Sequence, residues 1–190
     1  RARDLCDRVN GLDSNSILAA CELASYDIFY RNPKNAIMYT YVEPNEDTIF
    51  SISKMVIRSV EAIGKNTAIV MTGITFDQGY SELVSAGDAD YLTDDTLWDM
   101  KVSLNKYPTS DETLQLLMYY VMGCHSIHCD IFKRLSYIAI FNPRYNRIYR
   151  LPVQFINKDL IKEVEEKVIG YNNSIVDILA EQQKITRMAL

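Results

Sequence analysis

The sequence predicts a mixed α/β fold, an α+β arrangement in which helices flank a mixed β-sheet. Apolar residues recur at helical spacing near residues 46–63 and 110–125, and β-branched residues are concentrated in segments between and after them. The resulting order between residues 47 and 141 is helix, strand, strand, strand, helix, strand. At 190 residues, of which 48% are hydrophobic and 24% charged, the chain is long enough for one domain with a sizeable core.

Residues 1–44 are predicted to form an accessory helix and strand outside that core. Asp13–Ser16 offers an N-cap for a largely buried helix, and Ile37–Val42 is strand-like. A second helix is expected from about Glu46 to Ile63, where apolar residues mark a core face and Gly64 follows as the stop. Nothing in residues 1–44 indicates chemistry, so we interpret this segment as packing.

An acidic hairpin in the middle of the chain organises the predicted sheet. Thr67–Phe76 is rich in β-branched residues and predicts a strand. A short strand from about Ser81 to Val84 is expected to lead into the hairpin, which we place at residues 85–103. Asp94-Asp95 separates two apolar-rich runs within it, so these two residues are the expected hairpin loop.

A two-residue loop at that position sets the register of the hairpin. Asp90 is then opposite Asp99 and Asp88 is opposite Lys101, and the alternation of side chains places all four on one face. Two carboxylates at that spacing repel each other unless a proton or a cation lies between them. An all-oxygen site of this kind suits Mg²⁺, with Mn²⁺ as an alternative. The competing interpretation is an exposed hairpin whose charges only solvate an edge strand.

The helix after the hairpin carries two polar residues on one face. A polar loop, Asn105–Thr109, precedes it, and Ser110-Asp111-Glu112 offers a hydroxyl cap with two acids near the positive end of the helix. Gln115 and Tyr119 are four residues apart and therefore share a face. On an otherwise apolar helix such a pair usually belongs to ordinary packing.

Three short motifs together resemble a known family. Gly87-Asp88-Ala89-Asp90, followed by Asp99-Met100-Lys101, resembles the GxxD and (D/E)xK motifs of the PD-(D/E)XK nuclease superfamily. Gln115–Tyr119 resembles the QxxxY helix motif of its RecB-like branch. The resemblance covers residues 47–151 and implies a restriction-endonuclease-like αβββαβ core. It also implies metal-dependent hydrolysis of DNA phosphodiester bonds, in phage defence, mobile-element or DNA-processing roles.

The resemblance assigns roles to the residues of the hairpin. Asp90 and Asp99 would hold one or two Mg²⁺ ions, with the Met100 carbonyl as a third ligand. Lys101 would orient the attacking water or steady the charge that develops on phosphorus. We therefore expect these four residues to form the catalytic and metal-binding centre.

Other residues extend the implied site. Gln115 would bond a metal-bound water or a carboxylate, and Tyr119 would contact a phosphate near the cut. Asp88 is a neighbour of Lys101 that would tune it rather than bind metal. In the superfamily the helix before the first core strand often supplies an acid. Glu61, and more weakly Glu46, are the residues available here, although a solvated helix carboxylate explains either one as well.

The most uneven charge in the chain follows the helix. Residues 131–158 contain six basic residues and no acidic one, and strands are predicted at Tyr137–Phe141 and Tyr145–Leu151. Three arginines of this hairpin are candidate contacts to the DNA backbone: Arg144, Arg147 and Arg150. A solvated edge hairpin is an equally good explanation. The net charge of −5 argues against indiscriminate coating of nucleic acid.

Cysteines and histidines do not predict a metal centre. The spacing of the four cysteines is unlike a disulfide framework, which favours free thiols in a reducing compartment. It also differs from the four-cysteine pattern of an iron–sulfur cluster. The residues of Cys124–Cys129 form two His–Cys pairs that point in different directions on a helix, so a tetrahedral zinc site is not expected.

The C-terminal segment and the location of the protein complete the sequence-based expectations. Two amphipathic helices, Lys158–Ile169 and Ser174–Leu190, either cover the sheet or form a homo-oligomer face. The longest apolar runs are too short to span a membrane, and no signal-peptide pattern follows the first residue, so we expect a trimmed, cytoplasmic protein. Two rival classes stay open, a catalytically silent nuclease-fold protein that binds nucleic acid or a partner, and a protein-interaction module.

Overall fold

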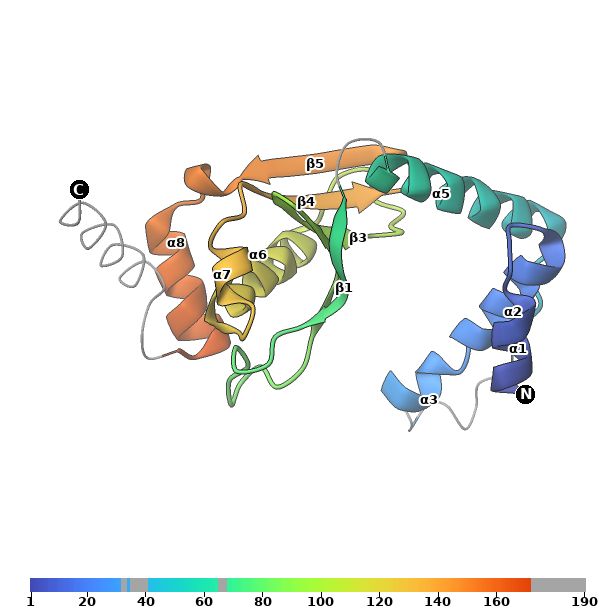
Figure 1. Cartoon of the computed structure of the whole chain (residues 1–190), viewed down its shortest axis with the longest axis horizontal. Coiled ribbons are helices and arrows are strands. Elements are labelled where there is room, and N and C mark those ends of the chain that lie inside the picture. Colours follow the sequence, from blue (N-terminus) through green and yellow to red (C-terminus); the bar gives the residue numbers. More distant parts are fainter. Residues whose placement is uncertain (32–33, 35–40, 65–67, 172–190) are drawn as a thin grey trace. The chain divides into compact units, whose positions relative to one another are not determined.

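The computed structural model describes residues 1–31, 34, 41–64 and 68–171 (Figure 1). The chain divides into two units, Arg1–Ala62 and Ile63–Leu190. The sequence predicts one domain whose core begins near residue 47. The helix that follows residue 45 groups instead with the N-terminal helices, and the sheet belongs wholly to the second unit.

The described residues of the N-terminal unit form helices joined by turns and irregular segments, with no strand. Its helices are α1 (Ala2–Arg8), α2 (Ser14–Ala24), α3 (Asp27–Arg31) and α5 (Glu46–Gly64). Asp13 caps α2 as predicted, because its side chain accepts hydrogen bonds from the amides of Asn15 and Ser16. The predicted strand Ile37–Val42 falls mostly outside the described residues. No described helix combines the length and apolar character needed to cross a membrane.

The second unit contains a five-stranded mixed sheet, in agreement with the predicted fold class. The strands are β1 (Ile69–Thr75), β2 (Asp88–Thr93), β3 (Thr96–Met100), β4 (Tyr137–Asn142) and β5 (Arg147–Pro152). They lie in sequence order across the sheet. Only β3 and β4 are parallel, because the chain crosses over through helices between them; the other neighbours are antiparallel.

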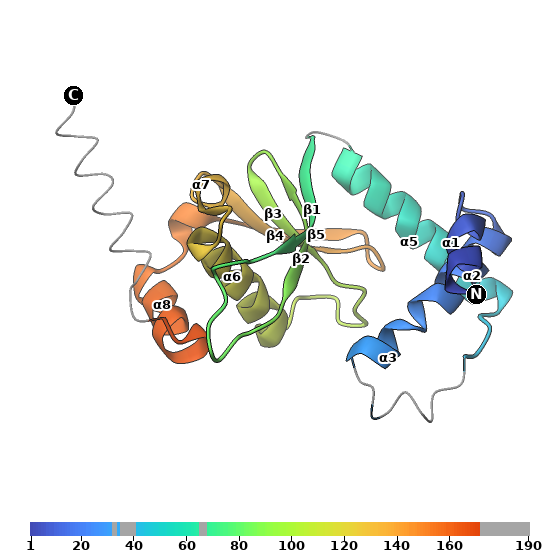
Figure 2. The same ribbon diagram turned by 60° about the horizontal axis from the view of Figure 1, so that its bottom comes forward.

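Helices of the second unit cover one face of that sheet. They are α6 (Ser110–His125), α7 (Cys129–Phe132), the 3₁₀ turn η1 (Val153–Phe155), α8 (Lys158–Glu163) and the π-helical η2 (Val164–Ile169). Figure 2 shows α6 lying along the sheet with α7 and α8 beside it. The core lies between α6 and the sheet, and includes Leu97, Val121 and Ile140.

The beginning of α6 differs by one residue from the predicted cap. Thr109, rather than Ser110, is the N-cap: its hydroxyl accepts from the Glu112 amide, and the Glu112 carboxylate accepts from the Thr109 amide in return. This capping box satisfies two amides that the first turn would otherwise leave unpaired. The predicted helix of residues 158–169 is present as α8 and η2, whereas residues 174–190 lie outside the described part of the chain.

The hairpin register agrees with the prediction. Tyr91 pairs with Trp98 and Leu92 with Leu97, which is the register of a two-residue Asp94-Asp95 loop. By alternation from Leu92 and Leu97, Asp90 and Asp99 lie on the face that α6 covers. The local pattern of apolar runs around two aspartates was thus sufficient to set the pairing.

The β2–β3 ladder is short, and the two strands separate towards the acidic end. β2 continues beside β1, where Asp88 pairs with Thr75, and β3 continues beside β4, where Met100 pairs with Phe141. The β2–β3 ladder ends at Tyr91 and Trp98, so it contains neither of the predicted pairs, Asp90 with Asp99 or Asp88 with Lys101. The Lys101 amide donates to the Phe141 carbonyl instead, at 2.9 Å.

The predicted short strand Ser81–Val84 is absent, and a side chain explains why. The Ser81 hydroxyl accepts hydrogen bonds from the amides of Leu83 and Val84, at 3.2 and 3.0 Å, and donates to the Ile169 carbonyl. Serine side chains that bond nearby amides compete with strand ladders. The segment is therefore a tight turn anchored to η2.

Candidate functional site

A lysine held by two acceptors lies at the acidic end of the sheet. Lys101 Nζ is 2.7 Å from Asp99 Oδ2 at the end of β3 and donates to Gln115 Oε1 on α6 at 2.6 Å. The Lys101 side chain is 25% exposed, so it borders solvent rather than lying in the core. Sheet and helix thus fix the ammonium from two sides. Two of its three N–H donors are directed at these acceptors, and the third remains for a substrate or water.

Asp90 approaches the same point from β2. Its Oδ2 accepts a hydrogen bond from the Met100 amide at 2.5 Å. Met100 stands between Asp99 and Lys101 in the sequence. The contact bridges the gap where β2 and β3 separate. Asp90 is exposed, whereas Asp99 is buried at 3% exposure. The two carboxylates therefore differ in environment although they belong to one end of the hairpin.

The charge on Asp99 is costly for the folded protein. Burial raises the pKa of Asp99, the Lys101 ammonium opposes that shift, and the charges of Asp90 and Glu112 raise the pKa further. Among the described residues, the ion pair with Lys101 at 2.7 Å is the polar contact of Asp99 Oδ2, and no backbone or hydroxyl donor adds to it. A buried carboxylate oxygen with one ammonium beside it retains lone pairs that a bound cation could use.

The donor set fits a hard divalent cation only in part. Asp90 and Asp99 offer oxygen atoms, but no group of three His, Cys, Asp or Glu side chains among the described residues is placed to hold a metal ion. A Mg²⁺ ion is commonly held by one or two carboxylates while it keeps several waters or takes substrate phosphate oxygens. The two aspartates suit that mode of binding, and the Met100 carbonyl directly follows Asp99 in the sequence.

Tyr119 contacts the start of β2. Its ring lies beside Gly87, where a Cβ atom would come within 3.2 Å of Cε1, and packs against Phe76 with ring centroids 5.3 Å apart. Burial raises the pKa of Tyr119 to about 12, the charges of Asp99, Asp88 and Asp90 raise it as well, and the Asp88 amide hydrogen bond lowers it. The phenol is therefore neutral. These contacts favour a positioning role for Tyr119 over the predicted contact with phosphate.

Gly87 explains the glycine of the first motif. Its φ of 151° lies in a region that side chains with a Cβ rarely adopt, and the Tyr119 ring occupies the space beside it. The glycine therefore allows the chain to turn into β2 directly against α6. Sequence reasoning identified the motif but not this contact.

The three candidate DNA-binding arginines lie at different ends of the sheet. Arg147 pairs with Asn142 at the end of β4, beside which Lys101 follows the parallel strand β3. Arg144 is in the turn between β4 and β5. Arg150 pairs with Ala139, three positions further along β5, and faces the opposite side of the strand. The register therefore places Arg144 and Arg147, but not Arg150, at the site end of the sheet.

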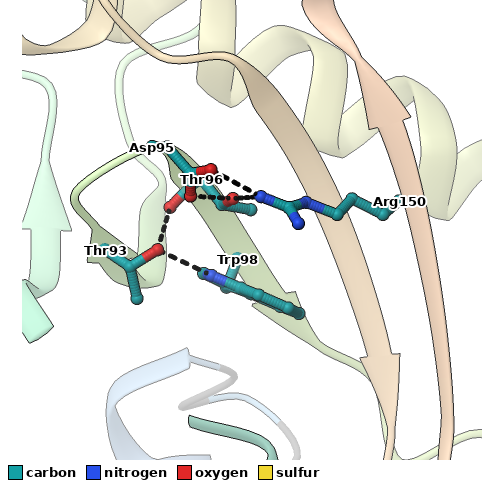
Figure 3. A network of polar contacts seen from close by, with 5 residues as sticks. All are labelled: Thr93, Asp95, Thr96, Trp98 and Arg150. Atoms are coloured by element: carbon teal, nitrogen blue, oxygen red, sulfur yellow. Dashed lines mark hydrogen bonds and ion pairs between the residues drawn. The ribbon is translucent and has the colours of Figure 1, made fainter. Parts of the chain in front are cut away.

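Arg150 belongs to a polar network around the hairpin loop (Figure 3). Its guanidinium donates to Asp95 Oδ2 and Thr96 Oγ1, each at 2.7 Å, and stacks on the Tyr137 ring at 3.5 Å. Thr93 continues the network, because its hydroxyl donates to the Thr96 carbonyl and accepts from the Trp98 indole. These contacts stabilise the turn between β2 and β3. Arg150 is thus occupied within the protein rather than directed at a ligand.

The other residues considered from the sequence are glutamates, cysteines and histidines. Glu46 and Glu61 are exposed on α5 in the N-terminal unit. All four cysteines are free thiols, and burial raises the pKa of Cys124 to about 12. His125 Nε2 is 3.1 Å from the buried Glu165 Oε1, which links α6 to η2. The contact of His125 joins the end of α6 to the C-terminal helical segment.

Comparison with known proteins adds no relative: the chain matches no protein-family model, and neither the curated proteins nor the solved structures contain a significant match. The candidate site therefore depends on its own geometry. That geometry brings together Asp90, Asp99, Lys101, Gln115 and Tyr119, all five of the catalytic residues that the three motifs predict.

Proposed function

We propose that this chain is a metal-dependent nuclease that hydrolyses DNA phosphodiester bonds, with a restriction-endonuclease-like core of the RecB-like kind. The main support is the Asp99–Lys101–Gln115 contact, in which a helix and a strand fix an ammonium beside a buried carboxylate. Packing alone does not require such a carboxylate, since burial raises its pKa and the neighbouring ammonium only partly opposes that shift. The resemblance of the three motifs supports the same assignment.

Hydrolysis requires a water oxygen to bond to phosphorus while the bond from phosphorus to the leaving sugar oxygen breaks. The water loses a proton in this step, and the leaving oxygen gains one from solvent. Asp90 and Asp99 are the residues that would hold Mg²⁺, or Mn²⁺, and the bound ion would supply positive charge to the phosphate. The remaining N–H of Lys101 is suited to orient the water or to bond a phosphate oxygen whose charge increases.

Supporting residues would keep these groups in place. Gln115 fixes the Lys101 ammonium, and the Tyr119 ring fixes the chain that leads to Asp90. Arg144 and Arg147, at the same end of the sheet, are suited to contact the DNA backbone. The phosphate would thus be approached from the hairpin end rather than from the Arg150 end.

A cleavage assay tests the proposal on linear, circular and single-stranded DNA, with Mg²⁺, with Mn²⁺ and with chelator. We expect cleavage by the wild-type protein that chelator abolishes. Asp99→Asn and Lys101→Met should lower the rate by about 100-fold or more, the scale of losing a charge-stabilising group. Asp94→Asn and Lys158→Met change exposed residues of the same types away from the site and should retain activity.

A catalytically silent nucleic-acid-binding protein is the second candidate. One observation favours it: Asp90 Oδ2, a predicted metal ligand, already accepts the Met100 amide, and the described residues supply no third acid. A wild-type preparation no more active than Asp99→Asn, but still able to bind DNA, would decide for this alternative and against hydrolysis.

A further inference from the structure

The loop between the two halves of the site exposes apolar side chains. Residues 102–108, here called the exposed loop, connect Lys101, which directly follows β3, to the beginning of α6, which carries Gln115. Val102 is 62% exposed, Leu104 is 73% exposed and Tyr107 is 66% exposed. Three large apolar side chains exposed within one short loop beside a candidate site are a feature that binding surfaces share.

The backbone of the exposed loop is nevertheless held in place. Asn142, a buried residue at the end of β4, donates its side-chain amide to the carbonyls of Ser103 and Asn105, each at 3.2 Å. The Asn105 amide in turn donates to the Ser103 hydroxyl at 3.1 Å. Two carbonyls of the loop are thus satisfied by one residue of the sheet.

Two tyrosines of the β4–β5 hairpin fix the rest of the loop. The Tyr145 hydroxyl donates to the Leu104 carbonyl at 2.7 Å, and the Tyr149 hydroxyl donates to the Lys106 carbonyl at 2.5 Å. The Tyr107 ring meets the Tyr149 ring edge-on, with centroids 6.1 Å apart. The loop therefore presents its apolar side chains from a preorganised backbone, which lowers the entropy cost of binding a ligand.

The charge around the loop selects the kind of ligand. Residues 100–110 contain Lys101 and Lys106 but no acidic residue, and Asp99 and Asp111 flank them in the sequence. Residues 131–158 contain six basic residues and no acidic one. Lys106 Nζ lies 5.5 Å from the centre of the Tyr107 ring. Arg147 is at the same end of the sheet and Tyr145 is 41% exposed. Aromatic and aliphatic groups between cations suit a ligand that combines flat apolar rings with phosphates.

We propose that the exposed loop binds unpaired bases of a single-stranded nucleic acid and so presents that strand to the candidate site. Base faces are buried in a duplex, whereas each unpaired base offers a ring that stacks on an aromatic side chain whatever its sequence. Tyr107 would be the main stacking residue, with Leu104 beside it and Lys106 and Arg147 contacting phosphates. The inference rests on the proposed function, because it names the substrate form that the nuclease site would take.

Binding of the full-length chain to short oligonucleotides tests this inference. Fluorescence anisotropy with chelator, which prevents cleavage, compares oligothymidylate, oligouridylate and a DNA duplex of about 16 nucleotides, the upper range for a single binding fold. We expect one or both single strands to bind about tenfold or more tightly than the duplex. Tyr107→Ala should weaken single-strand binding about tenfold, the effect of losing one stacked base, and Tyr107→Phe should retain it.

Phe155→Ala provides the matched control, because Phe155 is 71% exposed but lies in η1, beyond the opposite end of β5. It should leave binding unchanged. Equal affinity for single strand and duplex, or an unchanged affinity of Tyr107→Ala, would overturn the inference. The inference would also be overturned if Tyr107→Ala altered only the concentration-dependent mass measured by light scattering, because that result would indicate that the loop contacts a second copy of the chain.

The outcome separates this inference from the proposed function. Single-strand binding that depends on Tyr107, in a protein that does not cleave with Mg²⁺, would support the proposed role of the exposed loop and refute hydrolysis. Metal-dependent cleavage that is lost in Asp99→Asn, together with preferred binding of duplex, would support hydrolysis and refute the role of the loop.

Discussion

Replacing Gln115 by methionine tests the arrangement around Lys101 most directly. Methionine keeps the unbranched shape and the helix propensity of glutamine but removes the Oε1 acceptor. The lost contact is a hydrogen bond of 2.6 Å to an ammonium. Hydrogen bonds to charged groups contribute about 1.5–3 kcal/mol. If this contact positions Lys101 in the transition state, its loss corresponds to a decrease of about 10- to 100-fold in kcat.

The exposure of Lys101 narrows the expected range of the decrease in kcat. Its side chain is 25% exposed, so water replaces part of the lost bond and the lower end, about tenfold, is expected. Single-turnover cleavage with saturating Mg²⁺ measures the effect, and KM should stay the same because Gln115 contacts the lysine rather than the substrate. Gln154→Met, an exposed glutamine in η1, is the control and should cleave at the wild-type rate. An unchanged kcat, or a change confined to KM, would refute the positioning role of Gln115.

Three further predictions concern the charge, the glycine and the arginines. Burial is the main cause that raises the pKa of Asp99 above its ordinary 3.8, so the folded protein favours the protonated carboxyl. The stability that this protonation contributes is fully present below pH 3.8 and is lost as pH rises through the folded-state pKa. Asp99→Asn should therefore be more stable than wild type at neutral pH and lose this advantage in acid, as urea unfolding across pH measures. Gly87→Ala should cost about 1–3 kcal/mol in denaturant unfolding because its φ is unfavourable for alanine, whereas Gly64→Ala, with nothing within 4 Å of its new Cβ, should cost nothing. Arg147→Ala should weaken DNA binding and reduce its salt dependence by about one charge, whereas Arg150→Ala should lose about 1 kcal/mol of stability and leave DNA affinity unchanged.

Local patterns predicted the parts of the fold that depend on neighbours in sequence. The two aspartates between apolar runs set the hairpin register, and the spacing of apolar residues located α6. Gln115 and Tyr119 could be placed on one face because a helix fixes the direction of residues four apart. These features need no information about distant parts of the chain.

Features that depend on distant contacts were not predicted. Arg150 seemed free to bind DNA because its partner, Asp95, is 55 residues away in the sequence. Ser81–Val84 seemed to be a strand because the pattern of side chains does not reveal that the Ser81 hydroxyl takes the amides of the segment. The exposed loop was read as merely polar, since the hydrogen bonds that hold it come from the hairpin some 40 residues later, through Asn142 and Tyr145.

The bond between Asp90 and the Met100 amide affects how experiments on this protein are interpreted. The Asp90 side chain links β2 to β3 where the two strands separate. Removing it therefore deletes this hydrogen bond as well as a negative charge. Inactivity of an alanine variant would then have two causes that a rate alone does not separate. Asparagine keeps an oxygen that can accept the amide hydrogen bond and removes the charge. The difference between the asparagine and alanine variants therefore measures the contribution of this hydrogen bond separately from that of the charge.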